Sequence, residues 1–322
     1  VSRESVSVLV TRKVFPETID YLRKHFRVIS NQEDRVITSD ELAMLLSKVR
    51  GAQISTSDII NSKVLEECKN LKIICNTAVG FDNVDLNACN KKGVIVTNTP
   101  DVLTETVADY AIGLIISACR RINYYENYLR KGQWKRTSLT DLLSQDVHSR
   151  IFGFMGFGRI GRAIAGRLAG FHGKNIYYSR NRLPKKEERQ FQAEYVSKNE
   201  LLRTADVIVL ILPYTKDTHH FIGETELGMM QKSAVLVNMA RGGIVDDLAL
   251  IDALKSGRIF SAALDVYENE PDINEQFFKL ENAVLSPHLG SATINTRRAM
   301  SMRAAKNLVL GLNGHTAPDI VN

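Results

Sequence analysis

Several features that define particular protein classes are scarce or missing in this chain of 322 residues. No run of eighteen apolar residues occurs, so we expect no membrane span. The first thirteen residues, VSRESVSVLVTRK, have neither a long apolar segment nor a small-residue cleavage site, which argues against a secretory signal. Only four cysteines occur, and no two form a C-x-x-C pair. These absences predict a cytoplasmic protein with reduced, buried thiols.

The net charge of +6 is the one compositional feature that could indicate a nucleic-acid partner. Lysines and arginines are spread along the chain, however, and acids stand between them, as in LPKKEER at residues 183–189. No basic stripe with interleaved aromatic residues occurs. We therefore expect small anionic ligands and no nucleic acid.

Short apolar segments alternate with helix-like patterns almost throughout the chain. In the first hundred residues the strand-like segments are VSVLV, AQIS, LKIICNT and VIVTNTP. A second series starts near Ile151 and comprises IFGFM, NIYYS, VIVLIL, AVLVNM, SAALDV and AVLSP. Strands this apolar are typical of parallel sheets that helices cover on both faces.

Two longer helical patterns, Leu103–Arg121 and Asn295–Asn313, mark the crossings between the two series. The first opens with acids and closes with bases, as the helix dipole favours. It is apolar on more than one face, so we expect it to pack between domains or subunits.

The length exceeds what one hydrophobic core usually serves. We therefore predict an α/β protein with two doubly wound parallel-sheet domains and a cleft between them. Residues 1–100 and 289–322 would form a substrate-binding, flavodoxin-like domain. Residues 101–288 would form an inserted dinucleotide-binding domain.

The stretch FGFMGFGRIGRAIAGRL contains the strongest local motif. Gly156, Gly158 and Gly161 form G-x-G-x-x-G directly after an apolar strand and before an amphipathic helix. The first glycine permits a tight turn, the second lets backbone approach a pyrophosphate, and the third lets helix and strand pack closely. An ordinary glycine turn is the alternative, but the flanking strand and helix favour a Rossmann-type dinucleotide site.

About 20 residues downstream, such sites carry an acid that binds the ribose 2′-hydroxyl. In this chain the corresponding stretch, IYYSRNR, offers Ser179, Arg180 and Arg182 and no acid. An acid would repel a 2′-phosphate, whereas a hydroxyl and guanidiniums would hold it. The sequence therefore predicts NADPH as the preferred cofactor, with NADH possible. The alternative is that both arginines are solvated loop residues.

Polar side chains follow three of the later strands. Arg241 follows VLVNM, Asp265 and Glu270 follow SAAL, and His288 follows AVLSP. Singly, they could be a surface arginine, turn acids and a core histidine. Ligands bind at the carboxyl ends of strands in such sheets, so together they predict an anion clamp, an acid/base group and its partner. The adjacent His219 and His220 do not share a face and no second cluster of ligands is visible, so we predict no metal site.

The segments GFGRIG, NMARGGIVDD, LDVYENEP and PHLGSAT, in this order and spacing, resemble the D-isomer-specific 2-hydroxyacid dehydrogenase family over essentially the whole chain. Within the family, LILPYTKDTHHFIG and LSPHLGSATINTR are most similar to the glyoxylate/hydroxypyruvate reductase B group, also described as 2-ketogluconate reductases. The resemblance implies reduction of small 2-keto acids (glyoxylate, hydroxypyruvate or 2-keto-D-gluconate) to D-2-hydroxy acids. It also implies a homodimer.

The resemblance further implies roles for individual residues. Arg241 would bind the substrate carboxylate, His288 would protonate the forming alkoxide, and Glu270 would orient His288 and keep it protonated. Backbone N–H groups of Val79 and Gly80, in the loop TAVGF, would complete the carboxylate site. A plain strand-to-helix turn is the alternative for that loop.

Additional cofactor contacts follow from the same resemblance. Those toward the phosphates and the central part would be Thr104, Arg159, Ile160, Leu212 and Pro213. Those near the nicotinamide would be Thr218, Met239, Asp265, Gly290 and Ser291. Asp265 would meet the carboxamide or, alternatively, cap a neighbouring loop. Trp134 would lie at a subunit interface, at the substrate rim or in simple packing.

Two other functions remain compatible with the sequence. A further dehydrogenase of the family, acting on phosphoglycerate or lactate, would use the same carboxylate clamp. A non-catalytic, dinucleotide-sensing scaffold like the family's corepressors can keep the same polar residues.

Overall fold

The computed structural model describes residues 6–322; residues 1–5, which begin the stretch examined for a secretory signal, lie outside the described residues. The chain divides into two compact units. The first extends to Leu103 and resumes at Ala292, and the second spans Thr104–Ser291. The predicted boundaries, after residues 100 and 288, fall shortly before these divisions.

The first unit is built on a parallel sheet with the strand order β2-β1-β3-β4-β5. Its strands are β1 (Ser7–Val10), β2 (Arg27–Ser30), β3 (Gly51–Ile54), β4 (Ile73–Asn76) and β5 (Ile95–Thr97). Its helices are α1 (Pro16–Arg23), α2 (Ser39–Leu46), α3 (Ser62–Leu65), α4 (Leu86–Lys92) and α12 (Ile294–Leu312). Alternate residues of β1 enter different core clusters, Leu9 one and Val8 the other, so both faces of the sheet are covered.

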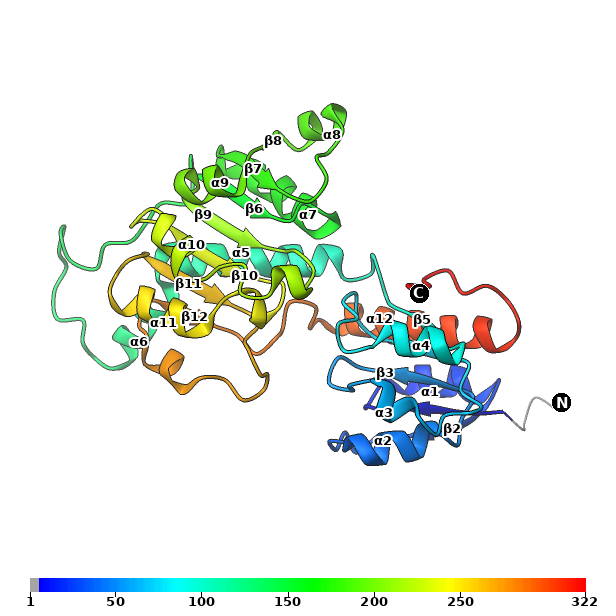
Figure 1. Ribbon diagram of the computed structural model, residues 1–322. Helices are drawn as coiled ribbons and strands as arrows, with labels where there is room; N and C mark the ends of the chain where they lie inside the picture. The colour runs from blue at the N-terminus through cyan, green and yellow to red at the C-terminus, as the bar shows by residue number, and fades with distance from the viewer. Residues whose placement is uncertain (1–5) are drawn as a thin grey trace. The chain divides into compact units, whose positions relative to one another are not determined.

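Helix α12 belongs to this sheet although it is far away in sequence. It packs against α1, β3 and β4, and the orange ribbon of α12 lies beside the blue and cyan elements in Figure 1. The chain thus returns to its first unit after completing the second.

The second unit is built on a parallel sheet with the order β12-β11-β10-β9-β6-β7-β8. Its strands are β6 (Ile151–Met155), β7 (Lys174–Tyr178), β8 (Ala193–Tyr195), β9 (Val207–Leu210), β10 (Val235–Asn238), β11 (Ser261–Leu264) and β12 (Ala283–Leu285). Its helices are α5 (Thr104–Arg120), α6 (Ile122–Arg130), α7 (Arg159–Leu168), α8 (Lys185–Gln190), α9 (Lys198–Thr204), α10 (Glu224–Met229) and α11 (Asp247–Lys255). The predicted α/β class with two parallel sheets is confirmed.

The apolar faces of α5 are used within the second unit. The helix packs against α7 on one side and against β10, β11 and β12 on another, and it buries Ala108, Ala111 and Ile115 completely. The prediction that these faces pack between domains or subunits was therefore wrong for the buried positions. A helix placed between another helix and a sheet needs apolar residues on two faces.

Two further findings concern the length and hydropathy of the helices and the state of the cysteines. Within residues 6–322, no helix is both long and apolar enough to cross a membrane. The four cysteines are all buried and unpaired, as predicted. Burial raises the pKa of the Cys75 thiol to about 12, so this thiol stays protonated and unreactive at neutral pH.

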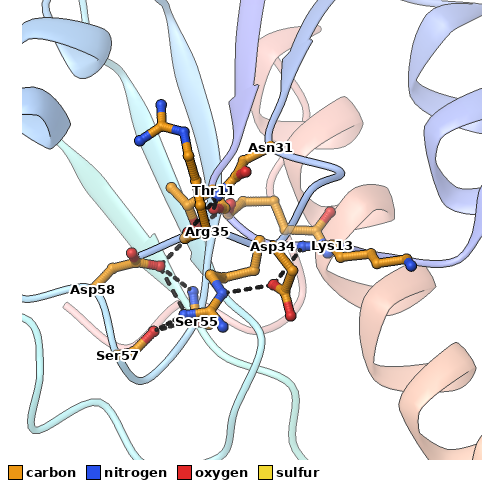
Figure 2. A network of polar contacts seen from close by, with 10 residues as sticks. Thr11, Lys13, Asn31, Asp34, Arg35, Ser55, Ser57 and Asp58 are labelled. Atoms are coloured by element: carbon orange, nitrogen blue, oxygen red, sulfur yellow. Dashed lines mark hydrogen bonds and ion pairs between the residues drawn. The ribbon is translucent and has the colours of Figure 1, made fainter. Parts of the chain in front are cut away.

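A polar network holds the carboxyl edge of the first sheet, where β1 and β3 end (Figure 2). The Asp58 carboxylate is only 5% exposed. It accepts hydrogen bonds from the Thr11 hydroxyl at 2.6 Å and from the Ser55 backbone N–H at 2.8 Å. In the same view, Asp34 accepts from Arg12 at 2.8 Å, but its side chain is 46% exposed. Both acids therefore accept hydrogen bonds from neighbouring residues, but Asp58 is buried and Asp34 is exposed.

Asp58→Ala is expected to lower the free energy of unfolding by about 2 kcal/mol, because the Thr11 hydroxyl keeps only its longer contact with the Gln53 carbonyl at 3.4 Å and the half-buried Ser55 N–H loses its acceptor. Asp34→Ala, the matched control at the surface, should cost less than about 1 kcal/mol. Urea denaturation followed by circular dichroism measures both changes. Equal losses for the two variants would contradict the assignment.

Candidate active site

The glycine loop connects β6 to α7, and its three glycines have different physical constraints. Gly156 has φ +88°, and a Cβ there would lie 2.7 Å from the Ile211 carbonyl oxygen. A Cβ at Gly161 would lie 3.1 Å from the Gly156 carbonyl oxygen. A Cβ at Gly158 would meet no other atom within 4 Å. The first and third glycines are thus needed by the fold itself, whereas the second leaves space on the open side.

This open space fits a dinucleotide. Gly158 is the N-cap residue of α7 and is exposed, so the first N–H groups of the helix face the space beside it. A pyrophosphate there would receive these N–H groups and the positive end of the helix dipole. The predicted contacts Arg159 and Ile160 form the first turn of the same helix.

The loop after β9 lies beside the glycine loop because β9 pairs with β6. A Cβ on Gly156 would lie 3.0 Å from the Leu212 Cα atom. The Thr218 hydroxyl donates to the Pro213 carbonyl at 2.9 Å and closes this loop. The structure thus brings Leu212 next to the glycine loop, and Pro213 and Thr218 are hydrogen-bonded to each other in the same loop.

The stretch after β7 places its polar residues unequally. Ser179 donates its hydroxyl to the Asn181 carbonyl at 2.6 Å, and Arg180 is exposed. Arg182, in contrast, forms a two-point ion pair with Glu188, with N···O distances of 2.8 and 3.2 Å. The three residues predicted to share one phosphate therefore do not share one set of contacts.

Glu188 explains where Arg182 is directed. Its side chain is only 6% exposed and also contacts Lys185 at 2.9 Å and the Tyr177 hydroxyl at 3.0 Å. Arg182 first, and Lys185 next, lower the pKa of this carboxyl to about 2. Arg182 thus pairs with a buried acid in its own domain, and a contact with a 2′-phosphate, as predicted, would compete with this ion pair.

Arg241, Glu270 and His288 follow three neighbouring strands, β10, β11 and β12. Because parallel strands end at the same edge, the order of the sheet brings these residues together. The turn after β10 is closely packed: a Cβ at Gly242 would lie 1.8 Å from the Tyr267 carbonyl carbon. The Arg241 side chain is half-buried and donates to the Ala240 carbonyl at 2.8 Å.

Glu270 and His288 form a hydrogen-bonded pair. The His288 Nδ1 atom lies 2.8 Å from Glu270 Oε2, and the side chains are 39% and 32% exposed. The other carboxylate oxygen of Glu270 accepts from the Tyr267 N–H at 2.8 Å. Burial opposes ionisation of Glu270, but the hydrogen bond and charge of His288, this N–H and the charge of Arg241 outweigh it, so that the pKa of Glu270 is lowered. Glu270 thus stays a carboxylate at neutral pH and orients the histidine ring.

The loop that carries His288 is fixed by Asp265, which is 2% exposed. The Asp265 carboxylate accepts from the Ser286 hydroxyl at 2.7 Å, from the Leu289 N–H at 2.7 Å and from the Gly290 N–H at 2.8 Å. Of the two predicted roles for Asp265, these contacts supply the capping of a neighbouring loop. His288 itself takes a left-handed backbone with φ +55°, and its N–H donates to the Asp265 carbonyl at 2.9 Å.

The residues around this loop include several predicted cofactor contacts. A Cβ at Gly290 would lie 3.2 Å from the Met239 Cε atom and 3.7 Å from Val107, one turn after Thr104 at the start of α5. Thr104 thus begins the helix whose next turn contacts the His288 loop. Ser291, at the end of the second unit, is half-buried.

Val79 and Gly80 lie in the first unit, after β4. The Asn98 side chain donates to the Val79 carbonyl at 2.8 Å, and the Asn76 side chain donates to the Gly80 carbonyl at 2.9 Å. The first contact holds the peptide plane that carries the Gly80 N–H. The Val79 N–H belongs to the preceding plane, whose Ala78 carbonyl accepts from the Thr99 N–H at 2.8 Å.

Some residues near the site were not predicted. Ser286 and Tyr110 are hydrogen-bonded through their hydroxyls, and because Ser286 donates to Asp265, Tyr110 donates to Ser286. No local pattern distinguishes these two hydroxyls from ordinary helix and loop residues. His219, His220 and Glu268 also come close together, although we predicted no metal site. His220 has φ +48°, so the rule for regular elements does not apply to this pair.

Comparison with known proteins adds independent findings. The family model for the NAD-binding domain of D-isomer-specific 2-hydroxyacid dehydrogenases matches residues 112–290. The glyoxylate reductase of Thermococcus gammatolerans is 43% identical over 319 residues, which are 98% of this chain and 95% of that protein. The glyoxylate reductase of Pyrococcus furiosus is 40% identical over the same shares of both chains.

A solved structure agrees with these relatives. The NADPH-dependent glyoxylate/hydroxypyruvate reductase of Sinorhizobium meliloti, in complex with NADP and malonate, is 33% identical, with a TM-score of 0.87 over 99% of this chain and 97% of that chain. One assignment agrees with the fold, with the glycine loop, with the polar residues after β10, β11 and β12, and with the relatives that match over nearly their full length. The chain belongs to the D-isomer-specific 2-hydroxyacid dehydrogenase family.

Proposed function

We propose that the protein is an NADPH-dependent reductase of small 2-keto acids and yields D-2-hydroxy acids. Glyoxylate, hydroxypyruvate and 2-keto-D-gluconate are the candidate substrates, and NADH is the poorer cofactor. The observation that carries the proposal is the hydrogen bond of 2.8 Å between Glu270 and His288 at the strand ends next to Arg241. Relatives named glyoxylate reductase support the substrate class.

In this proposal each group has a chemical task. The fork of Arg241 suits the carboxylate of a 2-keto acid and would direct the keto oxygen toward His288. Because Nδ1 of His288 faces Glu270, Nε2 is the nitrogen that would donate a proton to this oxygen. A bound nicotinamide would supply the hydride to C2 and leave oxidised. Hydride and proton together convert the ketone to a hydroxyl, and solvent returns the proton to His288.

Substrate and cofactor profiling tests this proposal against its alternatives. Purified protein would be assayed with glyoxylate, hydroxypyruvate, 2-keto-D-gluconate, pyruvate and phosphohydroxypyruvate, each with NADPH and NADH. Preferred turnover of pyruvate or phosphohydroxypyruvate would favour a lactate or phosphoglycerate enzyme. Absence of turnover with all five would favour the non-catalytic scaffold.

His288→Gln is expected to lower kcat by about 10²–10⁴-fold, because glutamine keeps a polar side chain but cannot supply the proton. NADPH affinity, measured by fluorescence titration, should stay within about twofold, since His288 is proposed to act on the substrate oxygen. A near-normal kcat would show that His288 is not the acid.

Glu270→Gln should lower kcat less severely than His288→Gln and should change the pH profile of kcat, because the residue paired with His288 then carries no charge.

The cofactor preference is proposed to rest on Arg180, with Ser179 beside it. Within the described part of the chain, the Arg180 side chain is exposed and no ion pair engages it. A 2′-phosphate would therefore not have to displace an internal carboxylate from this guanidinium. Arg182 would have to leave the buried Glu188 to do the same, which is costly for a buried acid.

Arg180→Asp is expected to raise KM for NADPH by about 10- to 100-fold, the value of one lost charge-assisted contact, and to change KM for NADH much less. Arg182→Gln is the matched control two residues away. It should leave the NADPH/NADH ratio unchanged and lower thermal stability, because Glu188 loses its first partner. A reversed pattern, with the ratio changed by Arg182→Gln and not by Arg180→Asp, would contradict this assignment.

We further propose that the protein is a cytoplasmic homodimer. Free, buried thiols suit a reducing compartment. Helix α6 buries none of its residues, and large apolar side chains remain exposed after it, Trp134 at 57%, Leu139 at 97% and Leu143 at 65%. An exposed apolar segment of this kind is typical of a protein–protein interface. Trp134 thus fits an interface better than simple packing within one chain.

Leu139→Asp with Leu143→Asp is expected to shift the protein from dimer to monomer, because two charges would have to be buried in the interface. Size-exclusion chromatography with light scattering measures the mass directly. Leu248→Asp, which changes another exposed leucine at 60% exposure, is the control and should leave the mass unchanged. A wild-type mass equal to the 36.1 kDa of one chain would sink the dimer.

A further inference from the structure

Two adjacent histidines and a glutamate converge at the carboxyl edge of the second sheet, outside the proposed catalytic groups. His219 and His220 follow the short 3-10 turn Lys216–Thr218 in the connection between β9 and α10, and Glu268 follows β11. One nitrogen from each histidine and one Glu268 carboxylate oxygen all lie within 4.8 Å of one another. The two imidazole rings stack with centroids 3.9 Å apart.

A local backbone feature brings the two rings to the same side. His220 has a left-handed backbone with φ +48°, which turns its side chain back toward His219. The His220 N–H donates to the Gly243 carbonyl at 2.8 Å, and this contact holds the bend against the turn after β10. The backbone of the fold thus places the two exposed histidines where their rings can meet.

Each histidine also has a polar partner on its Nδ1 atom. The Tyr214 hydroxyl lies 3.1 Å from Nδ1 of His219. Asp246 Oδ2 lies 3.8 Å from Nδ1 of His220, while Oδ1 of Asp246 caps helix α11. The Nε2 atom of His220 lies 2.7 Å from Glu268 Oε1. Metal-binding histidines usually have such a partner on the nitrogen that does not bind the ion.

We propose that His219, His220 and Glu268 bind a divalent transition-metal ion through the two Nε2 atoms and the carboxylate. Two imidazoles and one carboxylate suit Zn²⁺, with water completing a tetrahedron. Bond lengths of about 2.0–2.2 Å bring ligand atoms closer together than 4.8 Å, so the exposed His219 ring turns toward the other two on binding. The acid Asp246 at the rim adds to the attraction for a cation.

The position of this site gives the ion a structural consequence. His219 directly follows Thr218, which closes the loop beside the glycine loop, and Glu268 stands two residues before Glu270. A bound ion would thus join the loop after β9 to the loop that carries the partner of His288. Binding should reduce the opening of both loops.

Isothermal titration of metal-free, full-length protein with Zn²⁺ at pH 7.5 tests the proposal without substrate or cofactor. One Zn²⁺ per chain is expected, and Co²⁺ in its place should show the visible absorption of a tetrahedral site. Hydrogen exchange should slow in peptides covering 213–222 and 266–270. Because the readout is binding, it is independent of whether the protein reduces 2-keto acids.

Variants assign the binding to these residues. His219→Asn with His220→Asn should abolish the saturable Zn²⁺ site, and Tyr214→Phe should weaken it by about tenfold, the usual effect of removing an outer partner. His148→Asn is the matched control, because His148 is exposed beside one acid, Asp146 at 3.8 Å, and lacks a second histidine. The proposal is overturned if wild-type protein shows no saturable binding, or if the double variant keeps one Zn²⁺ per chain.

Discussion

The buried carboxylate of Asp265 is the constraint on which the candidate active site depends. No cation among residues 6–322 forms an ion pair with it, and it is instead stabilised by a hydroxyl and two backbone N–H groups of the loop that follows β12. A buried carboxylate is costly unless such donors surround it, so the loop cannot move without leaving the charge unsatisfied. His288 lies within this loop with a left-handed backbone. The orientation of the ring toward Glu270 follows from this backbone.

The order of the strands in the second sheet brings residues that are distant in the sequence to the same edge. Arg241 and His288 are far apart in the chain but follow strands separated only by β11, which itself leads to Glu270. This much could be predicted from the sequence, because apolar strands followed by polar residues are local patterns and parallel strands end at one edge. The glycine loop could be predicted for a related reason. The positive φ at Gly156 and the close packing at Gly161 both require glycine, so these constraints appear in the sequence as a local motif.

What could not be predicted depends on contacts that spacing does not encode. The ion pair between Arg182 and Glu188 is one example. It forms because Glu188, on α8, lies close to both Arg182 and the Tyr177 hydroxyl. The convergence of His219 and His220 requires one left-handed residue, and a sequence gives no such signal for histidine. Strand β2 and helix α2 were not predicted either. Strand β2 is a four-residue edge strand that exposes one of its residues, so it lacks a clear apolar run.

The internal charge balance also limits how the cofactor can be selected. Arg182 and Lys185 are both engaged by Glu188, and the Ser179 hydroxyl already donates to a backbone carbonyl. In the proposed cofactor site, the exposed guanidinium of Arg180 would therefore be the principal donor to a 2′-phosphate. A single charged hydrogen-bonding group contributes about 1.5–3 kcal/mol, which corresponds to a preference of about one to two orders of magnitude. If the proposal holds, such a site would favour NADPH over NADH without excluding NADH; the stretch 176–182 contains no acid that would bind the 2′-hydroxyl of NADH instead.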